Sequence, residues 1–152
     1  MGEVKKVLFL CIANSARSQM AEGLLNALGS GQWEARSGGI FSSYVHPLAI
    51  RAMEEIGIDI SKQTSKSIDR FAKKKFDYII TLCDDAAKVC PNFSGRGKRL
   101  HWPFDDPAAA IGTVEERLAV FRKVRNKIKM KIEEFLRSKS PEIPDPIASF
   151  KF

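Results

Sequence analysis

Short apolar runs alternate along this chain with segments whose apolar residues recur every three or four positions. Four segments have the length and content of β-strands: KVLFLC, WEARSGG, DYIITLC and KRLHW, at residues 6–11, 33–39, 77–83 and 98–102. Helical spacing marks residues 18–28 and 47–56, which end at Gly29 and Gly57, and a further short helix lies within residues 61–75. This alternation predicts an α/β fold, a three-layer sandwich with helices on both faces of a parallel sheet.

A long helix is predicted near the end of the chain. Thr113 and Glu116 have the spacing of a capping box, which marks its start. One apolar face then continues to about Arg137, and it comprises Val114, Leu118, Phe121, Val124, Ile128, Ile132 and Phe135. Residues 140–152 contain three prolines and cannot continue the helix. We therefore expect one domain over residues 1–139 and a Pro-containing tail over residues 140–152.

The net charge of +7 favours anionic partners. The basic residues form no nucleic-acid motif and have no aromatic residues interleaved, so we assign them to solvated helix faces and expect no nucleic-acid partner. No apolar run is long enough to cross a membrane, and the run near the N-terminus lacks the features of a signal peptide. Three cysteines, an odd number, do not suit a secreted disulfide framework. We expect a cytoplasmic monomer whose cysteines begin as thiols.

The candidate catalytic and anion-binding residues lie in the turn between the first predicted strand and the first predicted helix. Cys11 ends the strand, and Arg17 and Ser18 stand where the helix begins. A turn of this length can direct several backbone N–H groups at one oxyanion, and the helix N-terminus and the guanidinium add positive charge. Asn14 tolerates the left-handed backbone conformation that such a turn needs. The same positive field favours the thiolate of Cys11, which would then be a nucleophile at the floor of an oxyanion site.

This stretch resembles the phosphate-binding loop of the low-molecular-weight tyrosine phosphatase superfamily, and NSARSQMAEG is similar to its thioredoxin-coupled arsenate reductase branch. The resemblance continues through SGGI, AMEEIGIDIS, DYIITLCDDA and HWPFDDPA, and covers residues 5–137. It implies a four-stranded parallel sheet of order 2-1-3-4, with Cys11 as nucleophile and Asp106 as general acid. Asp105 is the less favoured acid. The oxyanion-binding residues that it implies are Ile12, Ala13, Asn14, Ser15, Ala16, Arg17 and Ser18.

Two further cysteines, Cys83 and Cys90, distinguish reduction from hydrolysis. By the resemblance, Cys11 attacks arsenate, Cys83 then attacks Cys11 and releases arsenite, and Cys90 moves the disulfide to Cys83–Cys90, where thioredoxin reduces it. If the segment between Cys83 and Cys90 were helical, their Cα atoms would lie about 10.5 Å apart, whereas a disulfide needs roughly 4.4–6.8 Å. We therefore expect any helix in this segment to unwind during the reaction.

Three alternatives remain beside arsenate reduction. A phosphatase acting on phosphotyrosine would use the same loop, although Ala108 stands where phosphatases place an aromatic residue. A redox-sensing or oxyanion-binding module would use the same cysteines without turnover. A zinc site of Cys83, Cys90 and His101 lacks a fitting spacing and a fourth ligand, so we expect no metal and no cofactor. The chain departs from the resemblance at Ala13, where glycine is usual, and at Lys66, where a carboxylate is usual.

Overall fold

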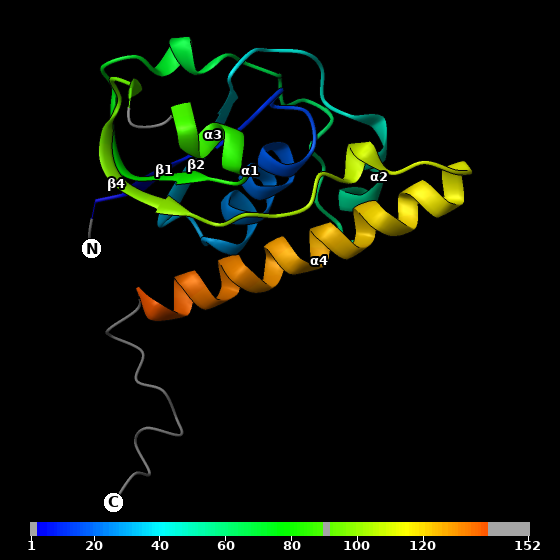
Figure 1. Cartoon of the computed structure of the whole chain (residues 1–152). Coiled ribbons are helices and arrows are strands. Elements are labelled where there is room, and N and C mark those ends of the chain that lie inside the picture. The colour runs from blue at the N-terminus through cyan, green and yellow to red at the C-terminus, as the bar shows by residue number, and fades with distance from the viewer. Residues whose placement is uncertain (1–2, 90–91, 140–152) are drawn as a thin grey trace, which may run out of the picture.

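A four-stranded parallel sheet forms the centre of the molecule (Figure 1). The computed structural model describes residues 3–89 and 92–139. The strands are β1 (Lys5–Cys11), β2 (Trp33–Gly39), β3 (Lys75–Thr81) and β4 (Arg96–His101), and their order across the sheet is β2-β1-β3-β4. The predicted order and the parallel pairing are both confirmed.

Helices connect and cover these strands. The α-helices are α1 (Arg17–Leu28), α2 (Pro47–Glu54), α3 (Asp84–Val89) and α4 (Val114–Ser138), and two 3₁₀ helices are η1 (Ile68–Phe71) and η3 (Pro107–Ala109). The helix expected over residues 47–56 ends two residues earlier, in a turn in which Gly57 has a φ of +79°. The short helix expected within residues 61–75 is η1.

The two sides of β2 show that helices lie on both faces of the sheet. Ser37 hydrogen-bonds Glu22 of α1, so its side chain faces that helix. Neighbouring residues of a strand point to opposite faces, and a side chain on Gly38 would instead meet Ile68 and Phe71 of η1. Helices α1 and η1 therefore cover opposite faces, as the three-layer prediction requires.

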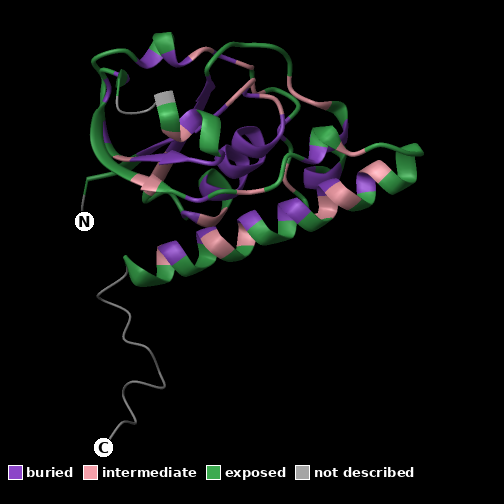
Figure 2. Ribbon diagram, viewed as in Figure 1, coloured by how far each residue is buried: buried purple, intermediate pink, exposed green. Residues whose placement is uncertain are grey.

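Helix α4 packs along the α1 side of the sheet and buries one stripe (Figure 2). Its capping box is present, with Thr113 and Glu116 each bonded to the other's backbone N–H. The predicted apolar face is confirmed except at Val114, the first residue of α4, which is 54% exposed. Arg125 was not predicted in this face. It is buried because its guanidinium donates to the Ala52 carbonyl at 2.7 Å and to Glu55 at 3.0 Å.

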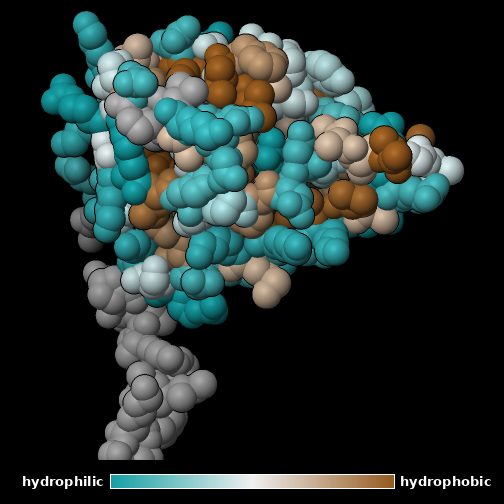
Figure 3. Space-filling model, in the orientation of Figure 1, coloured by the Kyte–Doolittle hydropathy of each residue, from teal (hydrophilic) through white to brown (hydrophobic). Residues whose placement is uncertain are grey.

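The outer surface is largely hydrophilic on the face shown in Figure 3, in keeping with a chain of which 28% is charged. Within the described ranges, no helix has the length and hydrophobicity needed to span a membrane. The predicted tail, residues 140–152, lies outside the described residues, so the domain boundary at residue 139 stays a prediction.

Candidate active site

The loop between β1 and α1 carries the predicted oxyanion site. Residues 12–16 bend between the strand and the helix, and Asn14 has the left-handed backbone expected of it, with a φ of +50°. Ala13 is not among the residues of positive φ, so alanine at this position is free of the strain that a left-handed backbone would impose. Helix α1 begins at Arg17 without a side-chain cap, so the N–H groups of its first turn remain directed toward the loop.

Gly39 allows the end of β2 to lie directly against this loop. The N–H groups of the next two residues, Ile40 and Phe41, donate to the carbonyls of Cys11 and Ile12 at 3.1 Å each. A Cβ atom on Gly39 would lie only 2.6 Å from the Ile12 carbonyl oxygen. The close approach of the two backbones therefore requires glycine, and it holds the loop in its bent form.

Cys11 is buried with its sulfur 2.7 Å from the hydroxyl of Ser18. The Asn14 amide donates to the same hydroxyl oxygen at 2.8 Å. Because the oxygen of Ser18 accepts from Asn14, its hydrogen is available to the sulfur. A hydrogen bond of this polarity stabilises a thiolate more than a thiol.

The structure brings Arg17 and Asp106 together. The Arg17 guanidinium, 7% exposed at its side chain, lies 3.7 Å from a carboxylate oxygen of Asp106 and donates to the Phe104 carbonyl at 3.1 Å. The other Asp106 oxygen accepts from the Ala108 N–H and caps η3. Asp105 is exposed and makes no ion pair with Arg17. Of the two neighbouring aspartates, it is therefore Asp106 that lies beside the loop.

Cys83 follows β3 next to the end of β1. Leu10 pairs with Thr81, and the Leu82 N–H donates to the Leu10 carbonyl at 2.9 Å, so the two cysteines leave adjacent strands at the same edge of the sheet. Adjacent strands are about 4.8 Å apart. The two cysteines thus lie at or just beyond the ends of neighbouring strands, at the carboxyl edge where parallel sheets bind ligands.

Burial is the main cause that raises the pKa of the Cys83 thiol. The neighbouring charges of Cys11 and Asp85 raise the pKa further. Two groups oppose this: the Ala86 N–H, 3.4 Å from the sulfur at the start of α3, and the Arg17 guanidinium. Cys83 is therefore held as a thiol in the resting protein, close to the cation that would favour its ionisation.

Cys90, the third predicted cysteine, lies outside the described residues. Helix α3 occupies the segment before it, Asp84–Val89, so the segment between Cys83 and Cys90 is helical, as the sequence analysis allowed. His101 ends β4, where its ring contacts Thr81 at 2.7 Å and Asp84 at 3.0 Å. Among residues 3–89 and 92–139, no three side chains of the metal-ligating types are grouped to hold an ion.

Sequence reasoning missed several residues that support the loop from outside. His46, in the loop directly before α2, caps that helix: its Nδ1 accepts from the Leu48 N–H, and its backbone N–H donates to the Ser15 carbonyl at 3.0 Å. Burial lowers the pKa of the His46 imidazole most, and the nearby charge of Arg117 lowers it further. Gln19 donates to both the carbonyl and the side-chain oxygen of Asn14. The cap at His46 could have been predicted from the proline that follows it, since Pro is common in the first turn of a helix.

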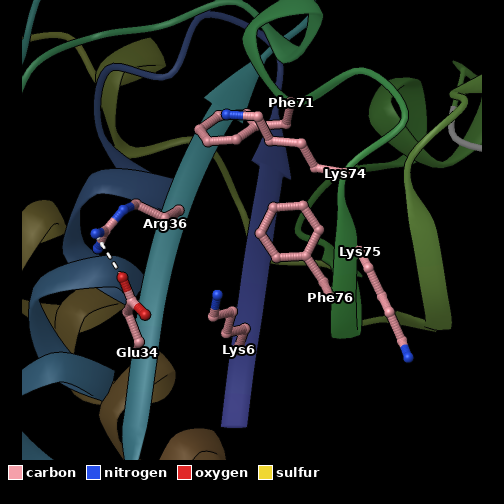
Figure 4. Close-up of a pocket in the computed structure, with 7 residues that line it drawn as sticks. All are labelled: Lys6, Glu34, Arg36, Phe71, Lys74, Lys75 and Phe76. Atoms are coloured by element: carbon pink, nitrogen blue, oxygen red, sulfur yellow. Dashed lines mark ion pairs between the residues drawn. The ribbon is translucent and has the colours of Figure 1, made fainter. Parts of the chain in front are cut away.

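A cavity of about 420 Å³ lies away from this loop, over the amino-terminal halves of the strands. It is lined by Lys6, Glu34, Arg36, Phe71, Lys74, Lys75 and Phe76, and Figure 4 shows the ion pair of Glu34 with Arg36 at its edge. Of the predicted catalytic residues that the structure describes, none lines this cavity, so it is separate from the β1–α1 loop.

Comparisons with known proteins agree with this geometry. A family model described as low molecular weight phosphotyrosine protein phosphatase matches residues 6–145. The chain is 50% identical to an arsenate reductase of Halalkalibacterium halodurans over 131 residues, 86% of this chain and 94% of the relative. It is 47% identical to an arsenate reductase of Bacillus subtilis over 133 residues, 88% of this chain and 96% of the relative.

Solved structures show the same likeness. An arsenate reductase in an oxidized state superposes with a TM-score of 0.76 at 40% identity, and one in a phosphate-binding state with a TM-score of 0.71 at 39% identity. Each comparison covers 89% of this chain and 98% of the other. A low molecular weight protein tyrosine phosphatase from T. tengcongensis, with a TM-score of 0.70 at 24% identity, shares the fold.

Proposed function

The chain belongs to the low molecular weight phosphotyrosine protein phosphatase family, and we propose that it is an enzyme that reduces arsenate to arsenite. The single observation that supports reduction over hydrolysis is Cys83, a second buried thiol beside the nucleophile's strand. Relatives with 47% and 50% identity over most of their length are arsenate reductases.

In the first step, arsenate binds in the loop of residues 12–17. Arg17 provides two parallel N–H donors, and the backbone N–H groups of the loop bind the remaining oxygens. The Cys11 thiolate attacks arsenic and forms a sulfur–arsenic bond, while one oxygen leaves as water. Asp106 supplies the proton for that oxygen, since its carboxyl lies on the Arg17 side of the loop.

In the second step, the Cys83 thiolate attacks the sulfur of Cys11. A Cys11–Cys83 disulfide forms, the sulfur–arsenic bond breaks, and its electron pair stays on arsenic, which leaves as arsenite. Arsenic(V) thus gains two electrons, and the two thiols lose two. Arg17 stabilises the ionised Cys83 that this step requires, because its guanidinium lowers the pKa of that thiol against the effect of burial.

In the third step, the Cys90 thiolate attacks Cys83 and releases Cys11 as a thiolate. The resulting Cys83–Cys90 disulfide is reduced by a dithiol protein, for which we propose thioredoxin, and the three thiols are restored. Helix α3 occupies all six residues from Asp84 to Val89 and holds its two ends about 9 Å apart. We expect it to unwind in this step. A reducing cytoplasm suits this cycle, with the protein acting as a monomer.

Phosphomonoester hydrolysis is the second candidate function. The loop, Arg17 and Asp106 form a set that also fits phosphate transfer to Cys11, because phosphate and arsenate are both tetrahedral oxyanions. Ala108, however, is a small exposed residue in η3, where an aromatic side chain would be needed to hold a phosphotyrosine ring. We therefore expect weak phosphatase activity that needs neither Cys83 nor Cys90.

A coupled assay separates these functions. NADPH oxidation is followed with thioredoxin and thioredoxin reductase on addition of arsenate, and release of p-nitrophenol is followed in parallel. Cys11→Ser should abolish both activities, whereas Cys83→Ser and Cys90→Ser should abolish only NADPH oxidation. Full arsenate-dependent NADPH oxidation in both Cys83→Ser and Cys90→Ser would contradict the proposed function.

A further inference from the structure

One face of the sheet is left partly open, and the opening takes no part in the proposed reaction. Helix η1 covers this face near the carboxyl ends of the strands, where a side chain on Gly38 would meet Ile68 and Phe71. Residues 34 and 36 share the face with Gly38, since side chains alternate along a strand. Parallel sheets are normally covered on both faces. Toward the amino ends of the strands this face instead carries charged side chains, and the hollow between them is the cavity of about 420 Å³ (Figure 4).

Two phenyl rings form the apolar wall of this cavity. Phe71 of η1 and Phe76 of β3 have ring centroids 5.9 Å apart and an interplanar angle of 72°. Both residues are buried, so the packing around them fixes the position of each ring. A planar apolar group that enters the cavity would meet aromatic side chains, which contact other rings favourably. The cavity also has the size of a small-molecule site, for which roughly 300–1,000 Å³ is usual.

The rim of the cavity is positively charged. Of its seven lining residues four are cationic and one is anionic, namely Lys6, Arg36, Lys74 and Lys75 against Glu34. Arg36 is paired with Glu34 at 2.5 Å. Within residues 3–89 and 92–139, neither Lys6 nor Lys74 forms an ion pair through its ammonium group. A bound anion would supply the partner that these two ammonium groups lack.

The directions of the lysine side chains separate those that face the hollow from the one that does not. Lys74 lies at the top of the hollow in Figure 4, with its nitrogen 5.9 Å from the centroid of the Phe71 ring. Lys6 comes from the start of β1 and directs its nitrogen toward the hollow from below. Lys75 extends away from the other labelled side chains. Two cations therefore flank the space in front of the phenyl rings.

We propose that this cavity binds a small organic anion that carries a planar apolar ring. The ring of the ligand packs against Phe71 and Phe76. Its anionic group, a carboxylate or a phosphate, pairs with Lys6 or Lys74. A small anion without a ring would gain only exposed ion pairs, which contribute little each. An uncharged ring would leave both ammonium groups without a partner, so binding requires both parts of the ligand.

The test titrates two probes into the full chain and measures binding by calorimetry. One is 2-naphthoate, a fused ring with a carboxylate, and the other is AMP, a purine nucleotide with a phosphate. Amide chemical shifts of the ¹⁵N-labelled protein locate the bound probe. We expect saturable binding of at least one probe, with shifts in residues 34–36 and 74–76, and the tighter probe shows which anionic group the site prefers. Failure of both probes to bind, or shifts confined to the loop of residues 12–17, would overturn the proposal.

Two comparison compounds test whether ring and charge are both needed. 2-Naphthalenemethanol keeps the fused ring without the charge, and acetate keeps the carboxylate without the ring. Each should bind at least about tenfold more weakly than 2-naphthoate, or than AMP where AMP is the tighter probe. Equal binding of the uncharged compound would contradict a role for the lysines, and equal binding of acetate would contradict a role for the phenyl rings.

Matched lysine variants test the cations themselves. Lys6→Met combined with Lys74→Met should weaken binding of the tighter probe about tenfold, as expected for the loss of two exposed ion pairs. Lys75→Met removes a neighbouring lysine that points away, so the affinity should stay within about twofold of the wild type. All three lysines are exposed, so the variants should fold and retain wild-type arsenate reduction.

A folded double variant with the affinity of the wild type would overturn the proposal. The titrations contain no arsenate and no thioredoxin. Absence of arsenate reduction by the wild-type protein would therefore contradict the proposed function and leave the binding result unaffected.

Discussion

Gly39→Ala tests how closely β2 must lie against the active-site loop. The added Cβ would lie 2.6 Å from the carbonyl oxygens of Ile12 and Phe41 and 2.7 Å from the Asn14 nitrogen, where ordinary contact begins at 3.4 Å. All three are backbone atoms, so no side chain can move aside. The loop must therefore yield by about 0.8 Å, a displacement of the size that overpacked positions relieve at about 1–3 kcal/mol.

The substitution should lower activity as well as stability. A misplacement of about 1 Å in catalytic geometry can lower the rate about 100-fold, so we expect Gly39→Ala to lower kcat/KM for arsenate by that order. The unfolding temperature should fall by about 2–12 °C, since each kcal/mol corresponds to about 2–4 °C in a domain of this size. The assay combines calorimetry with arsenate-dependent NADPH oxidation at a temperature well below unfolding.

Gly31→Ala is the matched control. Gly31 has a φ of +78° and no atom within 4 Å of its added Cβ, so alanine there strains the backbone without displacing a neighbour. It should lower the free energy of unfolding by about 1 kcal/mol and leave kcat/KM unchanged. A Gly39→Ala protein with wild-type kcat/KM would refute the argument that this contact sets the shape of the loop.

Three further predictions concern the acid, the long helix and α3. Asp106→Asn should lower kcat/KM by about 10²–10⁴-fold through loss of the proton donor, measured in the same assay, and an equal loss in Asp105→Asn would contradict the assignment. Thr113→Ala removes the capping box of α4 and should lower the unfolding free energy by about 1 kcal/mol in a denaturant titration, with turnover intact; an unchanged midpoint would argue against a stabilising cap. Amide hydrogen exchange over residues 84–89 should be faster in the Cys83–Cys90 disulfide form than in the reduced form, and equal exchange would count against unwinding of α3.

Apolar runs marked β1 and β3, and capping and glycine signals marked the helices, whereas the strand order was predicted from the family resemblance. The capping box at Thr113 predicted the start of α4 to the residue, and the conformation of Asn14 followed from its side chain alone. Helix ends were less predictable. Residues 55 and 56 keep helical spacing, yet the chain turns toward Gly57, since tertiary contacts decide where a short helix stops.

Contacts between distant segments could not be predicted from local pattern. Arg125 lies within an apolar stripe and is charged, and only its proximity to the Ala52 carbonyl and Glu55 explains its burial. His46 contacts the loop through a backbone N–H, a group that every residue other than proline possesses and that carries no sequence signal. The ion pair of Lys66 with Glu22 joins residues 44 positions apart, so its existence depends on the fold.

The central claim is that the chain itself provides both electrons for the reduction of arsenate. Its most direct test is a single turnover of the fully reduced protein with arsenate in the absence of thioredoxin, followed by rapid alkylation and tryptic peptide mapping. Trypsin leaves Cys11, Cys83 and Cys90 in separate peptides, at residues 7–17, 76–88 and 89–96. The account predicts one arsenite for each chain, a disulfide joining the peptides 76–88 and 89–96, and an alkylated Cys11; in Cys90→Ser, the disulfide should instead join peptides 7–17 and 76–88. Arsenite formed while all three cysteines remain alkylatable would contradict it.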